Sequence, residues 1–249
     1  MIKKTAGFLL TPFFLLFFFS TLVFFHPLLV IADKFLGYKY HMSVLKLMNK
    51  FILFELQFIG TKFIISLPYD LPRDRPVIIV SNHQSMFDIP LILINFTELD
   101  PKFIAKVELS RGIPSISYAL RNMGSAIIDR KDQKKAIETI ERFADSIKAK
   151  KIAACIFPEG TRARDGKLKK FKSAGLHTLI KKMPEAVIVP LVISGSWELL
   201  RYNFWPVPFG TKVYLKMLPP VDKVSDYEAK DLCLKIESLI AGELSNLCS

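Results

Sequence analysis

The sequence is poor in cysteine, with only Cys155, Cys233 and Cys248 among 249 residues. Their odd number and wide spacing do not fit a disulfide framework, and they form no CxxC or zinc-ligand pattern. A reducing compartment is the simpler interpretation. Cys155 lies in a predicted buried strand, where packing is a more ordinary role for a thiol than nucleophilic attack.

The motifs that define several enzyme classes are also missing. No Gly-x-Ser-x-Gly sequence occurs, which argues against a serine hydrolase built on a nucleophile elbow. Three of the four histidines, His26, His41 and His177, show no HExxH or other paired spacing, and no glycine-rich nucleotide loop is present. The sequence therefore predicts no metal site and no bound cofactor.

Acidic residues are outnumbered, since 35 Lys and Arg face 23 Asp and Glu, which gives a net charge of +12. Half of the residues are hydrophobic, and 21 are phenylalanine. A basic, apolar chain favours contact with an anionic membrane surface or with phosphate-bearing substrates. Nucleic acid is the competing interpretation of the charge, but no nucleic-acid motif or aromatic-basic platform is found, so we expect no nucleic-acid partner.

A nearly continuous apolar run occupies residues 8–31. As a helix it would be about 36 Å long, enough for a hydrocarbon core of about 30 Å. Three interpretations compete: a secretory signal peptide, a membrane-spanning helix and a re-entrant anchor. Pro12 and Pro27 interrupt the run, and lysines flank it on both sides, which favours membrane attachment with both ends on the cytoplasmic side. The re-entrant anchor is our preferred interpretation.

A second apolar pattern, at helical spacing, covers residues 40–58. It predicts either a membrane-surface helix, whose lysines reach headgroups, or an amphipathic helix packed on the domain. We therefore divide the chain into residues 1–58, a hydrophobic membrane-attachment segment, and residues 59–249, one α/β domain.

Buried strands alternate with helices in this domain, which predicts an α/β fold with a mixed central sheet flanked by helices. Apolar, often β-branched runs predict strands at residues 63–65, 77–80, 103–105, 126–128, 152–157, 187–193 and 213–215. Helices are predicted at residues 133–149 and 226–246, with a further one beginning near residue 89.

A histidine and an aspartate stand where the strand 77–80 ends and the next helix begins, in Ser-Asn-His83-Gln-Ser-Met-Phe-Asp88. Residues five apart do not share a helix face, so the two side chains meet only if His83 lies in the turn before the helix. Pro90 in the first helical turn fits this arrangement. Asp88 would then hold Nδ1 of His83 and leave Nε2 as a base. The alternative is a capping aspartate and an incidental histidine.

Three further stretches each follow or form a strand: Gly124 to Arg130, Phe157 to Arg162 and Val189 to Ile193. Alone, each has an ordinary explanation, such as a surface ion pair, a turn or an edge strand. Together and in this order, they and the His83 stretch resemble the PlsC-like 1-acylglycerol-3-phosphate acyltransferase family. That family carries Asn-His-x4-Asp, Gly-x-x-x-Ile-Asp-Arg, Phe-Pro-Glu-Gly-Thr-Arg and Val-Pro-x-x-Ile blocks. The resemblance covers roughly residues 60–220.

The resemblance implies a membrane-bound enzyme that moves a fatty acyl group to the sn-2 hydroxyl of 1-acylglycerol-3-phosphate, giving phosphatidic acid. The donor would be acyl-CoA or acyl-carrier protein. His83 and Asp88 would be catalytic, and the lysophosphatidic acid acceptor would lie against Glu159, Gly160, Thr161 and Arg162, with Lys106 and Arg130 as further phosphate contacts. Glu159 cannot bind phosphate itself, so we expect it to position Arg162 or an acceptor hydroxyl.

Other interpretations remain open at this point. The same chemistry on another lysophospholipid or on a lyso-ornithine lipid is the closest alternative. A lipid esterase and a non-catalytic membrane-surface protein are more distant ones. The lysines at positions 167, 169, 170, 172, 181 and 182 are predicted either to meet anionic headgroups or donor phosphates, or to form a solvated basic face. Backbone amides at residues 82–85 are candidates for stabilising the oxyanion.

Overall fold

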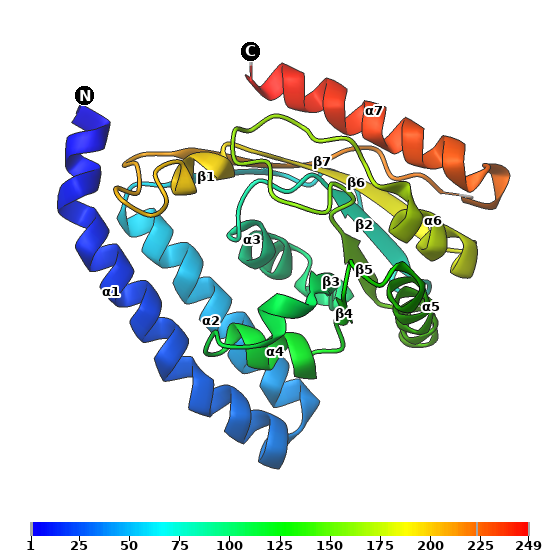
Figure 1. Ribbon diagram of the computed structural model, residues 1–249, viewed down its shortest axis with the longest axis horizontal. Helices are drawn as coiled ribbons and strands as arrows, with labels where there is room; N and C mark the ends of the chain where they lie inside the picture. Colours follow the sequence, from blue (N-terminus) through cyan, green and yellow to red (C-terminus); the bar gives the residue numbers. More distant parts are fainter. Residues whose placement is uncertain (1, 223, 249) are drawn as a thin grey trace.

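A seven-stranded sheet forms the centre of the computed structural model, which describes residues 2–222 and 224–248 (Figure 1). Residue 1, where the first predicted domain begins, and residue 249, where the second ends, lie outside this range. The strand order is β1-β7-β6-β2-β5-β3-β4, and all neighbours pair in parallel except β6 and β7. The strands are β1 Lys62–Ser66, β2 Val77–Ser81, β3 Lys102–Lys106, β4 Ala126–Ile128, β5 Ala153–Ile156, β6 Val187–Ser194 and β7 Lys212–Met217. The predicted mixed sheet is confirmed.

Helices cover both faces of this sheet. One side carries α5 Gln133–Lys150, α6 Ser173–Lys182 and α7 Ala229–Cys248, and the other carries α1 Ile2–Ile31, α2 Tyr38–Phe58, α3 Asp88–Asn95 and α4 Ile116–Asn122 (Figure 1). The apolar spacing of α5 buries Ala136, Ile140, Phe143 and Ile147 against the sheet, as its sequence predicts. Helix α4 was not predicted, because its seven residues are too few to show a clear period.

Strand β2 lies in the middle of the sheet and is buried on both faces. Val77 and Ile79 belong to the apolar cluster shared with α1, α2 and α3, whereas Ile78 and Val80 belong to the cluster shared with α5, α6 and α7. A parallel strand covered on both sides needs an unbroken apolar run, which is what the sequence provides. The end of β2 is therefore held rigidly, and His83 follows two residues later.

The N-terminal segment forms a helical hairpin in which α2 runs back beside α1 (Figure 1). Helix α1 continues through Pro12 and Pro27, although each proline removes one helical hydrogen bond. The expected interruption therefore does not end the helix; packing along α2 and the domain supports it. The reversal occurs at residues 32–37, where Gly37 adopts φ 88°.

Helix α2 has two apolar sides. Leu45, Met48 and Leu56 are buried against the rest of the protein, so the interpretation as a helix packed on the domain is confirmed for this side. Phe51 and Phe54 on the other side are 45% and 64% exposed, and a membrane-surface role for them stays a prediction. Among the described residues, one segment, Thr5–Leu36, is long and apolar enough to cross a membrane by length and composition.

Candidate active site

Four neighbouring parallel strands, in the order β2, β5, β3 and β4, end at the same edge of the sheet. His83 follows β2, and the Glu159 to Arg162 stretch follows β5. Lys106 is the last residue of β3, and Arg130 follows β4. The carboxyl edge of a parallel sheet is the usual place for ligands in α/β proteins. The strand order thus gathers residues that are up to 80 positions apart in the sequence.

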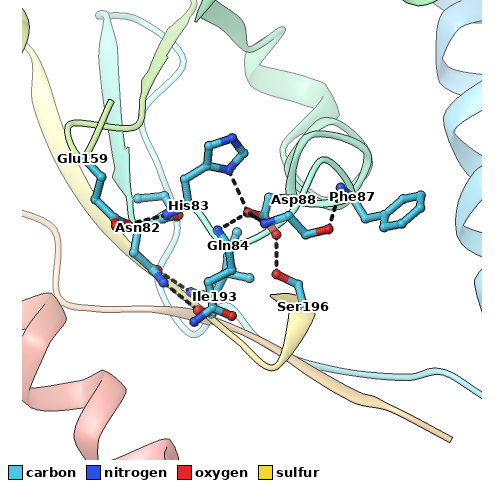
Figure 2. A network of polar contacts seen from close by, with 10 residues as sticks. Asn82, His83, Gln84, Phe87, Asp88, Glu159, Ile193 and Ser196 are labelled. Atoms are coloured by element: carbon cyan, nitrogen blue, oxygen red, sulfur yellow. Dashed lines mark hydrogen bonds and ion pairs between the residues drawn. The ribbon is translucent and has the colours of Figure 1, made fainter. Parts of the chain in front are cut away.

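His83 and Asp88 are paired as their spacing predicts (Figure 2). Nδ1 of His83 lies 2.8 Å from Oδ2 of Asp88, which is the first residue of α3. The imidazole stacks on the Phe157 ring, with the ring centroids 4.1 Å apart, and its side chain is 17% exposed. Contact with a carboxylate at Nδ1 favours the tautomer with its proton there, which leaves the lone pair of Nε2 available to a substrate.

Asp88 is completely buried and surrounded by donors. Its Oδ2 accepts hydrogen bonds from the backbone amides of Gln84 (2.7 Å) and Ser85 (2.8 Å), and its Oδ1 accepts one from the Ser196 hydroxyl (2.6 Å). These bonds fix the carboxylate beneath His83 and compensate for its burial. Ser196 was not predicted, because it lies 108 residues away and no local pattern marks it.

Asn82 fixes the turn that carries His83. Its side-chain amide donates to the Ile193 carbonyl (2.7 Å), and its side-chain oxygen accepts from the Ile193 amide (2.8 Å). This pair continues the bonding between β2 and β6 for one residue beyond the end of β2. Asn82 therefore has a structural role, and its place directly before the histidine was the only sequence signal for it.

Glu159 connects the histidine turn to the basic segment that follows it. Its Oε1 accepts from the His83 backbone amide (2.7 Å), and its Oε2 accepts from the Lys169 backbone amide (3.0 Å). Burial raises the pKa of this carboxyl to about 7, although the two amide hydrogen bonds lower it. We expected Glu159 to position Arg162 or an acceptor hydroxyl; instead, its hydrogen bonds among the described residues go to these two amides.

Three of the four backbone amides proposed for the oxyanion already donate to buried carboxylates. Those of Gln84 and Ser85 donate to Asp88, and that of His83 donates to Glu159. For these three groups the prediction is wrong, because the buried carboxylates take their hydrogens. The amides stabilise the histidine turn rather than the substrate.

A cleft of about 1010 Å³ opens beside His83. All the residues predicted for the acceptor site line this cleft except Glu159. Asp88 and Glu159 are buried and are not part of its wall. Its polar side consists of Lys106, Arg130, Gly160, Thr161, Arg162, Arg164 and Lys169, with Glu108 and Asp165. The apolar remainder extends to α1 and α2 and includes Phe18, Met48, Ile52, Met86, Phe87, Ile89, Phe103, Ile113, Ile116 and Leu120.

The guanidinium groups of the cleft are partly stripped of water. Burial lowers the pKa of Arg162, as does the neighbouring Arg164, while Asp88 opposes the change. Burial also lowers the pKa of Arg130, against the effect of Glu108. Nη1 of Arg130 is buried and has no hydrogen-bond partner among the described residues. Partly desolvated cations of this kind bind an anion more strongly than solvated ones do.

The lysine-rich segment divides into two parts. Lys169 belongs to the site, since its ammonium group donates to the Arg162 carbonyl (2.8 Å) and to the Thr161 hydroxyl (3.2 Å). Lys167, Lys170 and Lys172 are exposed outside the cleft, where both interpretations of their charge remain open. Gly160 adopts φ 74°, a conformation that side chains disfavour.

Comparison with known proteins places this geometry in a family. The family model described as Acyltransferase matches residues 62–194, just over half of the chain, and this range includes His83, Asp88 and the cationic residues of the cleft. The chain belongs to this acyltransferase family. The resemblance drawn from the four sequence blocks is confirmed.

Among individual members of the acyltransferase family, the chain is 31% identical over 175 residues to the chloroplastic 1-acyl-sn-glycerol-3-phosphate acyltransferase LPAT1 of Arabidopsis thaliana. This match covers 70% of the chain but 46% of the plant protein, so the chain spans about half of that relative's length. The 1-acyl-sn-glycerol-3-phosphate acyltransferase of Salmonella typhimurium is 28% identical over 191 residues, which is 76% of this chain and 75% of the relative.

A solved structure of the family shares the whole architecture. The crystal structure of PlsC, the 1-acyl-sn-glycerophosphate acyltransferase from Thermotoga maritima, superposes with a TM-score of 0.77 at 27% identity. The alignment covers 99% of this chain and 98% of that protein. The similarity therefore includes the helical hairpin as well as the sheet.

Proposed function

We propose that this protein transfers a fatty acyl group from a thioester donor, acyl-CoA or acyl-carrier protein, to the sn-2 hydroxyl of 1-acyl-sn-glycerol-3-phosphate. The product is phosphatidic acid. The observation that carries the proposal is the His83–Asp88 pair at a cleft with one cationic and one apolar part. The names of the relatives support the choice of acceptor.

His83 acts as the general base in this proposal. Its Nε2 removes the proton from the acceptor hydroxyl while the hydroxyl oxygen attacks the thioester carbonyl carbon. When the tetrahedral intermediate collapses, the carbon–sulfur bond breaks, and protonated His83 returns the proton to the departing thiolate. Asp88 stabilises the imidazolium that exists between these two steps. No acyl-enzyme is required.

The cationic part of the cleft binds the acceptor phosphate. Arg162 offers a planar group that can donate two parallel hydrogen bonds to phosphate oxygens. Nη1 of Arg130 has no hydrogen-bond partner among the described residues, and a phosphate oxygen supplies one. Lys106 adds a third charge from the end of β3. Glu159 acts by holding His83 and the basic segment together rather than by contact with the acceptor.

The apolar part of the cleft accepts acyl chains. It lies between the domain and the helical hairpin, and Phe18 of α1 and Met48 and Ile52 of α2 form part of its wall. The cleft therefore lies against the buried side of the hairpin, whose other side exposes apolar side chains. We propose that the hairpin is a re-entrant anchor, with the active site at the cytoplasmic face of the membrane. The antiparallel course of α1 and α2, which returns the chain to the side where it began, supports this topology (Figure 1).

The test is acyl transfer by the purified full chain, with labelled acyl donors and a panel of lysolipids that differ in headgroup. We expect transfer to 1-acyl-sn-glycerol-3-phosphate, and we expect His83→Ala to lose about 10²–10⁴-fold in turnover, the usual contribution of a general base. His177→Ala is the matched control, because His177 lies in α6 on the other side of the sheet. Full activity of His83→Ala would refute the mechanism, and transfer only to another lysolipid would refute the acceptor.

A further inference from the structure

The connection between β6 and β7 contains a segment of unusual composition, residues 201–210, which we call the aromatic loop. It holds Tyr202, Phe204, Trp205 and Phe209 within ten residues. It follows the short helix that carries Ser196, the residue bonded to Asp88. Neither the mechanism nor the four sequence blocks use this loop.

The aromatic loop is attached to helix α1, far from it in the sequence. The Val207 amide donates a hydrogen bond to the Thr11 hydroxyl (2.8 Å), and this pair is buried. Gly7 lies so close that a Cβ there would come within 2.6 Å of the Val207 carbonyl oxygen. The Trp205 ring meets the Phe8 ring edge to face, with their centroids 6.4 Å apart. These contacts fix the loop on the first turns of α1.

Three of the four aromatic side chains of the loop are exposed although its backbone is anchored, whereas Phe204 packs against the core. Trp205 is 51% exposed, Tyr202 is 38% exposed and Phe209 is 37% exposed. Phe8 of α1, which touches Trp205, is itself 43% exposed. The exposed Trp205 ring therefore continues the apolar surface of α1 onto the domain.

This composition matches the chemistry of a membrane interface. Trp and Tyr concentrate at the level of lipid headgroups, because their rings are apolar while their N–H and O–H groups seek polar partners. Arg201 lies over the rings of Trp197 and Tyr202, at 5.3 Å and 5.8 Å, and is exposed, so it places a positive charge at the same level. A water-facing loop has no comparable reason to expose three aromatic rings next to an apolar helix.

We propose that the aromatic loop is a second membrane-contacting element, which inserts Trp205 and its neighbours into the headgroup region of an anionic bilayer beside α1. A hairpin that attaches to a membrane alone leaves the tilt of the domain against the bilayer undetermined. A second contact on the domain restricts this tilt and fixes how the cleft faces the lipid. The proposal rests on the membrane attachment of α1, but its test does not depend on catalysis.

The experiment uses the full chain reconstituted in vesicles of phosphatidylcholine and phosphatidylglycerol. The chain has two tryptophans, so Trp197→Phe leaves Trp205 as the single fluorophore. We expect lipids brominated in the upper part of the acyl chain to quench Trp205 several-fold more than aqueous iodide does. Lipids brominated near the chain end should quench it less.

Two reporters serve as controls, both built on Trp197→Phe with Trp205→Phe. Phe24→Trp places the fluorophore on the exposed side of α1, where the original residue is 64% exposed, and brominated lipid should quench it. Leu234→Trp places it on α7, where the original residue is 55% exposed, and it should respond to iodide alone.

Each outcome decides the question. Quenching of Trp205 by brominated lipid supports the proposal. Quenching of the Phe24→Trp reporter without that of Trp205 overturns it and leaves the attachment of α1 standing. If neither quencher reaches Trp205, and dilution of the protein restores quenching by iodide, then the loop contacts another protein molecule. That result would also overturn the proposal. An absence of lipid quenching at both positions would overturn the proposal for the aromatic loop and the membrane attachment of α1. The acyl-transfer assay would still decide the catalytic function.

Discussion

Glu159→Gln is the substitution that most directly tests how the site is held together. The change keeps the shape of the side chain but replaces one acceptor oxygen with an NH₂ donor. Two backbone amides, those of His83 and Lys169, point at the carboxylate. In either orientation of the glutamine, one of these N–H groups faces another donor. Leaving a buried donor unsatisfied costs about 1–3 kcal/mol.

The effect of this substitution on stability depends on pH. The pKa of Glu159 is about 7 in the folded protein, against an ordinary value of 4.5. The raised pKa means that the folded state binds the proton more tightly than the unfolded state does. The contribution of Glu159 to stability is therefore fully present below about pH 4.5 and is lost as the pH rises through about 7. The pKa difference corresponds to about 3 kcal/mol. Glutamine does not titrate and loses nothing over this range.

Thermal unfolding of both proteins in the same detergent, followed between pH 5 and pH 8, measures the difference. We expect the glutamine variant to be less stable than the wild type at pH 5, by about 1–3 kcal/mol. By pH 8 the wild type has lost its contribution of about 3 kcal/mol, so the variant should equal the wild type or exceed it in stability by up to about 2 kcal/mol. The difference between their Tm values should therefore change by about 6–12 °C. A difference in Tm that stays constant over this range would refute the assignment of a raised pKa to Glu159.

Three further substitutions test other parts of the structure. Ser196→Ala removes the 2.6 Å hydrogen bond to buried Asp88 and should lower both Tm and turnover, by about 1–3 kcal/mol in stability; unchanged Tm and turnover would contradict the role of Ser196. Arg162→Lys keeps the charge but loses the bidentate geometry, so KM for the acceptor should rise about tenfold with little change in kcat, as steady-state kinetics can check. Gly195→Ala should cost more than about 3 kcal/mol in stability and reduce the yield of folded protein. The new Cβ would lie 2.1 Å from the Lys212 carbonyl oxygen, and residue 195 has φ 84°, which side chains disfavour. A normal Tm would show that this contact relaxes easily.

The strands and the longer helices were predictable because each carries a local signal. The apolar runs predicted all seven strands close to their observed bounds, although β1 is mostly exposed, and the 3.6-residue period predicted α5. Local spacing predicted the His83–Asp88 pair but left a capping aspartate and an incidental histidine as the alternative, and the 2.8 Å contact decides for the pair. Helix α4 was missed because a short helix has no room for a repeating pattern.

The partners of the buried carboxylates were not predictable in the same way. We assigned Glu159 to the acceptor or to Arg162, and we left the amides near His83 for the substrate. The structure shows the carboxylates of Glu159 and Asp88 bound to those amides instead. Hydrogen bonds between distant segments depend on exact orientation, which no periodicity in the sequence records.

The sequence by itself determined the residue types of the site, their positions at strand ends and the apolar character of the N-terminus, and it made the pairing of His83 with Asp88 one of two interpretations. Tertiary structure decided which strand lies beside which, and therefore that Arg130 and Arg162 share a cleft with His83. It also decided that Ser196 reaches Asp88 and that the aromatic loop lies against α1. The physical reason is that an apolar strand pattern specifies burial, and many strand orders bury the same surface equally well. Only the packing of the whole chain selects one of them.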